Sequence, residues 1–272
     1  MTALRHVARP DGARIAYRVV GAGRPVLLLH GTLSTGAQLR SLARALAADG
    51  ELAVVSVDRR GSGESRLPVS EPLDVATHVA DLVAVLDAEG HEATALVGHS
   101  LGGVVALEFA ARVPGRTRAV VAYEPPYGLV ADRTTRGWFV ELAAATEKAG
   151  RERGDAGAAE TFLRAVAGDA AWDALSDRAR AFLATEGGGA RADVSLLGAD
   201  PDGLRRIAAP VTLITGDASD PLYGPIADAL AARIATAHRV RLPGLRHPAP
   251  ITDPEPVAAA IVAALAAAAR GG

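Results

Sequence analysis

Val97-Gly98-His99-Ser100-Leu101-Gly102-Gly103 is the stretch that decides the fold, because it joins an apolar run at residues 93–96 directly to a helical pattern at residues 104–112. A sharp turn between a strand and a helix requires neighbours with almost no side chain, and Gly98 and Gly102 meet that requirement. The pattern predicts a nucleophile elbow. Its geometry would expose the Ser100 hydroxyl and place the Leu101 backbone N–H at a helix N-terminus, where negative charge is stabilised.

The chain before this turn alternates between strand and helix patterns. Short alternating segments around Pro10-Asp11-Gly12 predict an antiparallel hairpin, and continuous apolar runs predict buried strands. The first buried strand ends in His30-Gly31-Thr32, and the second is followed by the loop Asp58-Arg59-Arg60-Gly61-Ser62-Gly63-Glu64-Ser65. The predicted strands cover residues 5–9, 14–20, 25–29 and 52–57, and the predicted helices cover residues 35–48 and 75–89.

After the turn, a strand at residues 118–123 is stopped by Glu124-Pro125-Pro126. Strand patterns then vanish until residue 207, and helical stretches joined by glycine-rich breaks at 154–157 and 187–189 replace them. We therefore expect a core domain formed by residues 1–126 and 208–272, with a helical cap inserted at residues 127–207. The remaining elements are cap helices at 138–148, 158–166 and 171–185, strands at 210–215 and 239–242, and helices at 226–234 and 256–269.

Alternating strands and helices predict an α/β fold with an eight-stranded, mostly parallel, doubly wound sheet. In such a sheet the functional groups gather at the carboxyl ends of the strands. Four candidate groups follow predicted strands, and their joint occurrence carries more weight than any single motif. They are His30-Gly31-Thr32, Ser100, Glu124 with Asp220, and His247.

Composition limits the classes of function. The 272 residues carry 29 basic and 31 acidic side chains and a formal charge of −2, which favours neither nucleic acid nor an anionic membrane as a partner. The absence of cysteine excludes disulfides and thiol catalysis. No signal peptide or membrane anchor is recognisable. We expect a soluble cytoplasmic protein, monomeric or homodimeric, that acts on a small molecule without a metal or cofactor.

Over nearly its whole length the sequence resembles the α/β-hydrolase family. His30-Gly31 resembles the family's oxyanion turn, residues 58–65 resemble its D-x-R-G-x-G-x-S loop, and residues 98–102 resemble its elbow. His247 follows the last strand, as the family's catalytic histidine does, and Tyr123-Glu124-Pro125-Pro126 resembles one uncharacterised branch. The resemblance implies a Ser-His-acid triad beneath a helical cap.

The chemistry explains why these residue types are needed together. A serine hydroxyl is a weak nucleophile, so an imidazole must accept its proton and a carboxylate must hold that imidazole in the correct tautomer. Ser100 and His247 fill the first two roles. For the acid, Glu124 is favoured over Asp220, because Asp220 lies in a turn one residue longer than the family's usual Gly-x-x-Asp and could serve as a turn former instead.

The backbone N–H groups of Leu101 and Thr32 are the expected oxyanion donors. Residues expected to contact substrate are His30, Gly31, His99, Tyr127 and Trp138. His30 is also expected to shape the oxyanion turn. The cap aromatic residues have two interpretations, which are packing between helices and the lining of an apolar pocket.

These features predict a serine hydrolase that acts on a small or medium ester, lactone, thioester or related carbonyl compound. A serine at the elbow speaks against the dehalogenase and epoxide-hydrolase branches, which use an aspartate there. Two alternatives stay open. One is a lyase, cyclase or cofactor-free haloperoxidase or perhydrolase on the same scaffold. The other is a receptor-like binding protein in which turnover is incidental.

Overall fold

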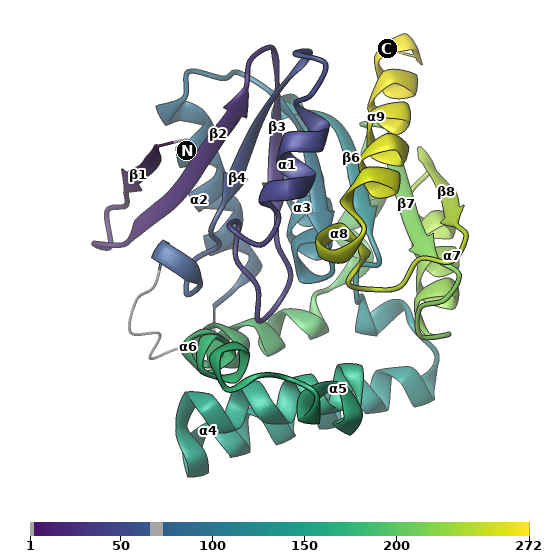
Figure 1. The fold of residues 1–272 in the computed structure, drawn as a ribbon. Helices are drawn as coiled ribbons and strands as arrows, with labels where there is room; N and C mark the ends of the chain where they lie inside the picture. The colour runs from purple at the N-terminus through teal and green to yellow at the C-terminus, as the bar shows by residue number, and fades with distance from the viewer. Residues whose placement is uncertain (1–2, 66–72, 272) are drawn as a thin grey trace.

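A computed structural model describes residues 3–65 and 73–271, and its described strands form one eight-stranded sheet in the order β1-β2-β4-β3-β5-β6-β7-β8 (Figure 1). β2 runs antiparallel to both of its neighbours, and all pairs from β4 to β8 are parallel. The predicted fold class is therefore confirmed. The strands are β1 (Leu4–Ala8), β2 (Arg14–Gly21), β3 (Arg24–Leu29), β4 (Leu52–Val57), β5 (Thr94–His99), β6 (Thr117–Tyr123), β7 (Val211–Gly216) and β8 (Ala237–Leu242).

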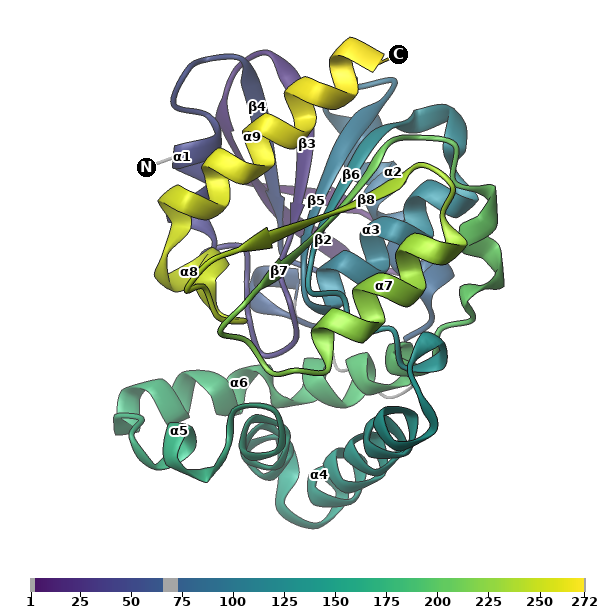
Figure 2. The same cartoon turned by 90° about the vertical axis from the view of Figure 1, so that its right-hand side faces the viewer.

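Helices cover both faces of this sheet (Figure 2). On one face, α1 (Arg40–Leu46) and α9 (Pro254–Gly271) enclose an apolar core with strand residues such as Leu28 and Val97. On the other face, α2 (Val75–Ala88), α3 (Leu101–Arg112) and α7 (Tyr223–Arg233) pack over residues such as Leu27 and Leu96. The short α8 (Ala249–Thr252) precedes α9. The parallel strands are continuous apolar runs because both of their faces are buried.

The segment between β6 and β7 forms the predicted helical insertion, and it lies across the carboxyl ends of the parallel strands (Figures 1 and 2). Its helices are α4 (Arg133–Ala167), α5 (Asp169–Asp173) and α6 (Asp177–Asp193), followed by 3₁₀ turns at Val194–Gly198 and Pro201–Arg206. The chain kinks at Gly154, which has a left-handed φ of 69°, so a break was correctly expected there. One helix predicted at residues 171–185 is two, because Ser176 caps a new helix through the Ala179 N–H.

The expected break at residues 187–189 is wrong, since these three glycines lie inside α6. They serve close packing. A Cβ atom on Gly187 would lie 1.9 Å from the carbonyl oxygen of Asp155, and one on Gly189 would lie 2.8 Å from that of Gly61. The glycines let α6 pass against α4 and against the loop that follows β4, and this contact outweighs their low helix propensity.

Helix α1 begins later than predicted, at Arg40 instead of Thr35. The preceding residues form a turn in which the Thr35 N–H donates to the Gln38 side chain, and the Gly36 N–H donates to Asp58. In the described part of the chain, no helix is long and apolar enough to cross a membrane.

Candidate active site

Ser100 lies in a strained turn between β5 and α3. Its φ of 51° and ψ of −124° are unfavourable for a residue with a side chain, and its N–H donates to the Tyr123 carbonyl at 2.8 Å. The turn is too tight for larger neighbours. A Cβ on Gly98 would lie 2.3 Å from the Gly102 carbonyl oxygen, and a Cβ on Gly102 would lie 2.4 Å from that of Leu29. The local sequence therefore dictates this conformation, which leaves the Ser100 side chain partly exposed.

Strained backbone is concentrated at this edge of the sheet. Among the described residues other than glycine, three have a positive φ: Leu33, Ser100 and Glu124. They follow β3, β5 and β6, whose carboxyl ends are neighbours in the sheet. Such conformations cost on the order of 1–3 kcal/mol each and persist where the surrounding structure fixes them, most often at functional sites.

Glu124 meets His247 at the centre of this edge. Its Oε2 lies 2.6 Å from His247 Nδ1, and its Oε1 accepts the Gly216 N–H at 2.8 Å. The Glu124 side chain is fully buried, whereas that of His247 remains 28% exposed. A carboxylate beside Nδ1 places the ring proton on that nitrogen, so Nε2 is left as a proton acceptor.

Asp220, the alternative acid, occupies a different position. Its carboxylate accepts the Leu222 N–H at 3.0 Å, and its carbonyl accepts the Tyr223 N–H. These bonds close the turn that leads into α7, so Asp220 acts here as a turn former. Within the described residues, the carboxylate hydrogen-bonded to His247 is that of Glu124.

Two other rings surround His247. The Tyr223 ring stacks parallel to it at 4.6 Å between centroids, with the Tyr223 hydroxyl 3.4 Å from Nε2. His99, next to Ser100 in the chain, donates through Nε2 to the His247 carbonyl at 2.9 Å. Burial, together with His247, lowers the pKa of His99 well below 6.5, so His99 is neutral. His99 thus supports the His247 loop and is itself buried.

The predicted oxyanion turn lies against the elbow, since a Cβ on Gly31 would lie 3.0 Å from Ser100 Cβ. His30 is fully buried, with Nδ1 2.8 Å from the Gly31 carbonyl and Nε2 accepting the Arg59 N–H. It therefore shapes the turn and presents no surface to a substrate. Leu101 is the first residue of α3, so its N–H has no acceptor within the helix.

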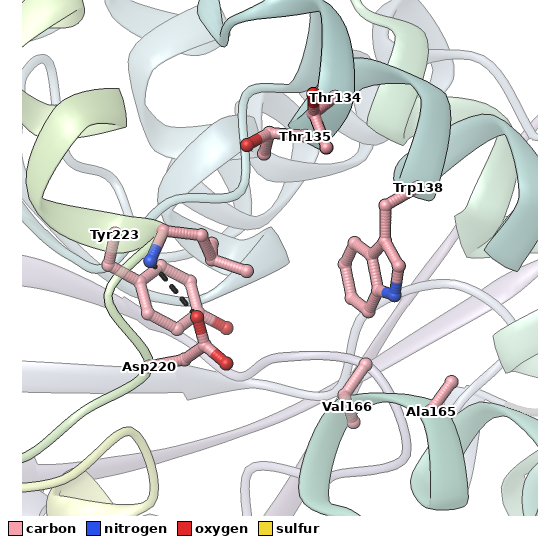
Figure 3. Close-up of a pocket in the computed structure, with 8 residues that line it drawn as sticks. Thr134, Thr135, Trp138, Ala165, Val166, Asp220 and Tyr223 are labelled. Atoms are coloured by element: carbon pink, nitrogen blue, oxygen red, sulfur yellow. Dashed lines mark hydrogen bonds between the residues drawn. The ribbon is translucent and has the colours of Figure 1, made fainter.

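A pocket of about 310 Å³ opens beside Tyr223, between the insertion and the loop after β7 (Figure 3). Trp138 lines it, and the Asp220 and Tyr223 side chains face it from the opposite side (Figure 3). Tyr127 lies elsewhere. It is buried, and its hydroxyl donates to Glu108 in α3, so it packs the insertion onto the core instead of lining this pocket.

Sequence reasoning missed Tyr223, Arg59 and Asp193, which all contact the predicted site residues. Tyr223 begins α7 directly after the loop at the carboxyl end of β7, and that position was its only signal. Arg59 belongs to the loop at residues 58–65, for which the sequence predicted no contact with the site. Asp193 lies at the end of α6, and nothing in its local sequence connects it to the oxyanion turn.

Comparison with known proteins agrees with this fold. The model of the Alpha/beta hydrolase family matches residues 26–260. The chain belongs to the α/β-hydrolase family. Its structure is similar to that of an α/β hydrolase from Sphaerobacter thermophilus DSM 20745 (26% identity, 96% and 99% of the two chains, TM-score 0.77). It is also similar to an esterase from Rhodococcus sp. ECU1013 (25% identity, 98% and 99%, TM-score 0.73).

Similarity to curated relatives is more local. A soluble epoxide hydrolase of Corynebacterium sp. (strain C12) is 36% identical over 107 residues, which are 39% of this chain and 36% of that protein. Lipase LipV of Mycobacterium tuberculosis is 34% identical over 108 residues, 40% of each chain. The matched segments thus span well under half of these relatives, which differ in the reactions that their names state.

Proposed function

We propose that this α/β hydrolase is a serine hydrolase with a Ser100-His247-Glu124 triad. The observation that carries the proposal is the 2.6 Å contact between His247 Nδ1 and the buried Glu124 carboxylate, one strand away from the strained turn that presents Ser100. A fixed carboxylate, a histidine with an accepting Nε2 and an accessible serine hydroxyl are the three groups that acyl transfer requires.

In the proposed mechanism, Ser100 Oγ attacks the substrate carbonyl while His247 Nε2 takes its proton. Glu124 holds the Nδ1–H and stabilises the imidazolium that forms. The Leu101 and Thr32 N–H groups bind the oxyanion. His247 then protonates the leaving group, and an acyl-Ser100 ester remains. A water molecule, deprotonated by His247, attacks that ester and releases the acid, which restores Ser100.

One end of a small or medium neutral substrate is proposed to occupy the pocket beside Tyr223, whose ring stacks on His247 but which Ser100 and His247 do not themselves line. The pocket's volume of about 310 Å³ lies at the lower end of the range for small-molecule sites. Trp138 and Val166 offer apolar surface, whereas the Asp220 carboxylate would repel an anion (Figure 3). We therefore assign an uncharged ester, lactone or thioester as the substrate class. We also propose that the helical insertion acts as a cap over the active site. The enzyme is proposed to be a cytoplasmic monomer or homodimer that needs no cofactor.

Pre-steady-state hydrolysis of p-nitrophenyl acetate tests this function. Acyl transfer predicts a burst of p-nitrophenol equal to the enzyme concentration when deacylation is slower than acylation, and trapped acetyl-enzyme in the intact mass after acid quench. Ser100→Ala should abolish both signals. Ser41→Ala is the matched control, because Ser41 is exposed on α1 and does not line the pocket beside Tyr223.

A wild-type protein without acetyl-enzyme and without turnover on any ester, lactone or thioester of a panel would contradict the proposal. Product formation from a non-ester substrate by His247 alone would then indicate the lyase or cyclase alternative. Saturable ligand binding without turnover would indicate the binding protein.

A further inference from the structure

A buried ion pair connects the helical insertion to the oxyanion turn. Asp193, the last residue of α6, receives a bidentate contact from Arg59, with Nη1 to Oδ1 at 2.8 Å and Nη2 to Oδ2 at 2.7 Å. The Thr32 hydroxyl donates to the same Asp193 Oδ2 at 2.9 Å. One carboxylate of the insertion therefore contacts both the oxyanion turn and the arginine beside it.

Arg59 also forms hydrogen bonds to the backbone of the oxyanion turn. Its Nε donates to the His30 carbonyl at 2.9 Å, and its Nη2 donates to the Gly31 carbonyl at 3.1 Å. The Gly31 carbonyl and the Thr32 N–H belong to one planar trans peptide, in which the two groups point in opposite directions. Holding the Gly31 carbonyl toward Arg59 therefore fixes the direction of the Thr32 N–H, which is the proposed oxyanion donor.

Water cannot replace these contacts, since Arg59 and Asp193 are each only 2% exposed. Burial would raise the pKa of Asp193, but the charge of Arg59 and the hydrogen bonds from Arg59 and Thr32 outweigh it and lower that pKa. The carboxylate is therefore ionised. Removing one partner of such a pair leaves an uncompensated buried charge.

We propose that Asp193 is a positioning residue for the oxyanion hole. From the insertion it fixes, through Arg59 and the Thr32 hydroxyl, the peptide whose N–H receives the developing negative charge. This inference rests on the proposed serine-hydrolase function. It also gives the insertion a role beyond covering the pocket, because the oxyanion hole reaches its final geometry only when α6 is docked on the core.

Three variants separate this role from simple packing. Asp193→Asn removes the charge and places amide hydrogens against Arg59. Thr32→Val removes only the hydroxyl and keeps the backbone N–H. Glu186→Gln is the matched control, because Glu186 is a second buried carboxylate on α6, and it accepts from the Gly63 N–H of the loop after β4 and from the Thr185 hydroxyl.

The first measurement is the rate at which a fluorophosphonate probe labels each variant, together with kcat and KM on p-nitrophenyl acetate. Loss of oxyanion-hole geometry predicts labelling and kcat lower by roughly ten- to a hundredfold in Asp193→Asn, less in Thr32→Val, with KM little changed. Glu186→Gln should stay within about twofold of wild type, since the Gly63 N–H and the Thr185 hydroxyl, from which it accepts, do not belong to the oxyanion turn.

The second measurement is hydrogen exchange of peptides covering residues 28–34, which does not depend on activity. Asp193→Asn should exchange faster there than wild type, and Glu186→Gln should not. A folded Asp193→Asn variant with wild-type exchange in this segment and wild-type labelling would overturn the proposal. If that variant does not fold, wild-type labelling and kcat in Thr32→Val would overturn it. A wild type that the probe does not label would refute the proposed function, and the exchange result alone would then decide whether Asp193 fixes the turn.

Discussion

Glu124 combines a strained backbone conformation with a fully buried carboxylate. Both of its carboxylate oxygens are engaged, one by the Gly216 N–H and one by His247, and its φ of 48° lies in the left-handed region. Pro125 follows and restricts Glu124 further. A buried carboxylate with both oxygens bonded cannot change rotamer without leaving a charge unpaired, so it can hold an imidazole in one orientation.

The choice of acid can be tested with near-isosteric substitutions. Glu124→Gln should lower kcat by roughly a thousandfold or more, because the amide no longer stabilises the imidazolium and misorients the ring. Asp220→Asn should lose less than about tenfold, or ~1.4 kcal/mol. Steady-state kinetics and thermal melts of both variants provide the check. A dead Asp220→Asn beside an active Glu124→Gln would reverse the assignment.

A functional residue could be predicted where its signal lies in the residues next to it in the sequence, and not where it depends on a contact with a distant segment. The elbow is recognisable because a tight turn requires its glycines at fixed offsets from Ser100. The acid was favoured only narrowly, since the choice depends on how closely the loop after β8 approaches the end of β6, a distance between segments far apart in the sequence. Asp193 could not be found for the same reason, because its partner Arg59 lies 134 positions away.

Within the helices of the insertion, glycine has two opposite structural roles. Gly154 breaks α4 with a left-handed φ, as predicted. Gly187 instead lies inside helix α6, and it is a glycine because the backbone of α4 comes too close for any side chain. Both sites read alike in the sequence, and only the contact between the two helices distinguishes them. The sheet was more predictable than the insertion, since buried parallel strands have a distinctive continuous apolar pattern.

Two tryptophans of the insertion have different environments, and the difference is measurable. Trp138 lines the pocket, whereas Trp172 is buried, with the Arg164 and Arg180 guanidinium groups each 5.8 Å from its ring centroid. Trp138→Ala should shift the kcat/KM ratio between a long acyl ester and an acetyl ester with little effect on stability. Trp172→Ala should destabilise the fold by about 3 kcal/mol and leave that ratio unchanged.

Chain-length profiles with p-nitrophenyl esters and chemical denaturation of both variants make this comparison. Equal loss on all esters in Trp138→Ala, accompanied by a lower free energy of unfolding, would show that Trp138 acts in packing and not in substrate selection.

Burial of neutral histidines makes the stability of the whole molecule depend on pH. Burial and the Arg59 charge lower the pKa of His30 from 6.5 to about 3 and that of His78 from 6.5 to about 4. The unfolded chain binds these protons below pH 6.5, and the folded chain does not. The contribution of these two neutral histidines to the free energy of unfolding is therefore fully present above pH 6.5. It is lost as the pH drops toward their folded-state pKa values of about 4 for His78 and about 3 for His30.

At pH 5 each of these histidines should lower the free energy of unfolding by about 2 kcal/mol relative to pH 7.5. Urea denaturation at both values measures the change, and His78→Leu, which removes one titrating group, should show a smaller loss on acidification. Equal stability of the wild type at pH 7.5 and pH 5 would contradict the burial of both neutral rings.

The most direct test of the central claim is the intact mass of the protein after reaction with a fluorophosphonate, followed by peptide mapping of the modified residue. The triad predicts one phosphonyl adduct per chain, located on Ser100, in the wild type and none in Ser100→Ala. Glu124→Gln should be labelled far more slowly than the wild type. An unmodified wild-type protein, or an adduct that persists in Ser100→Ala, would contradict the account.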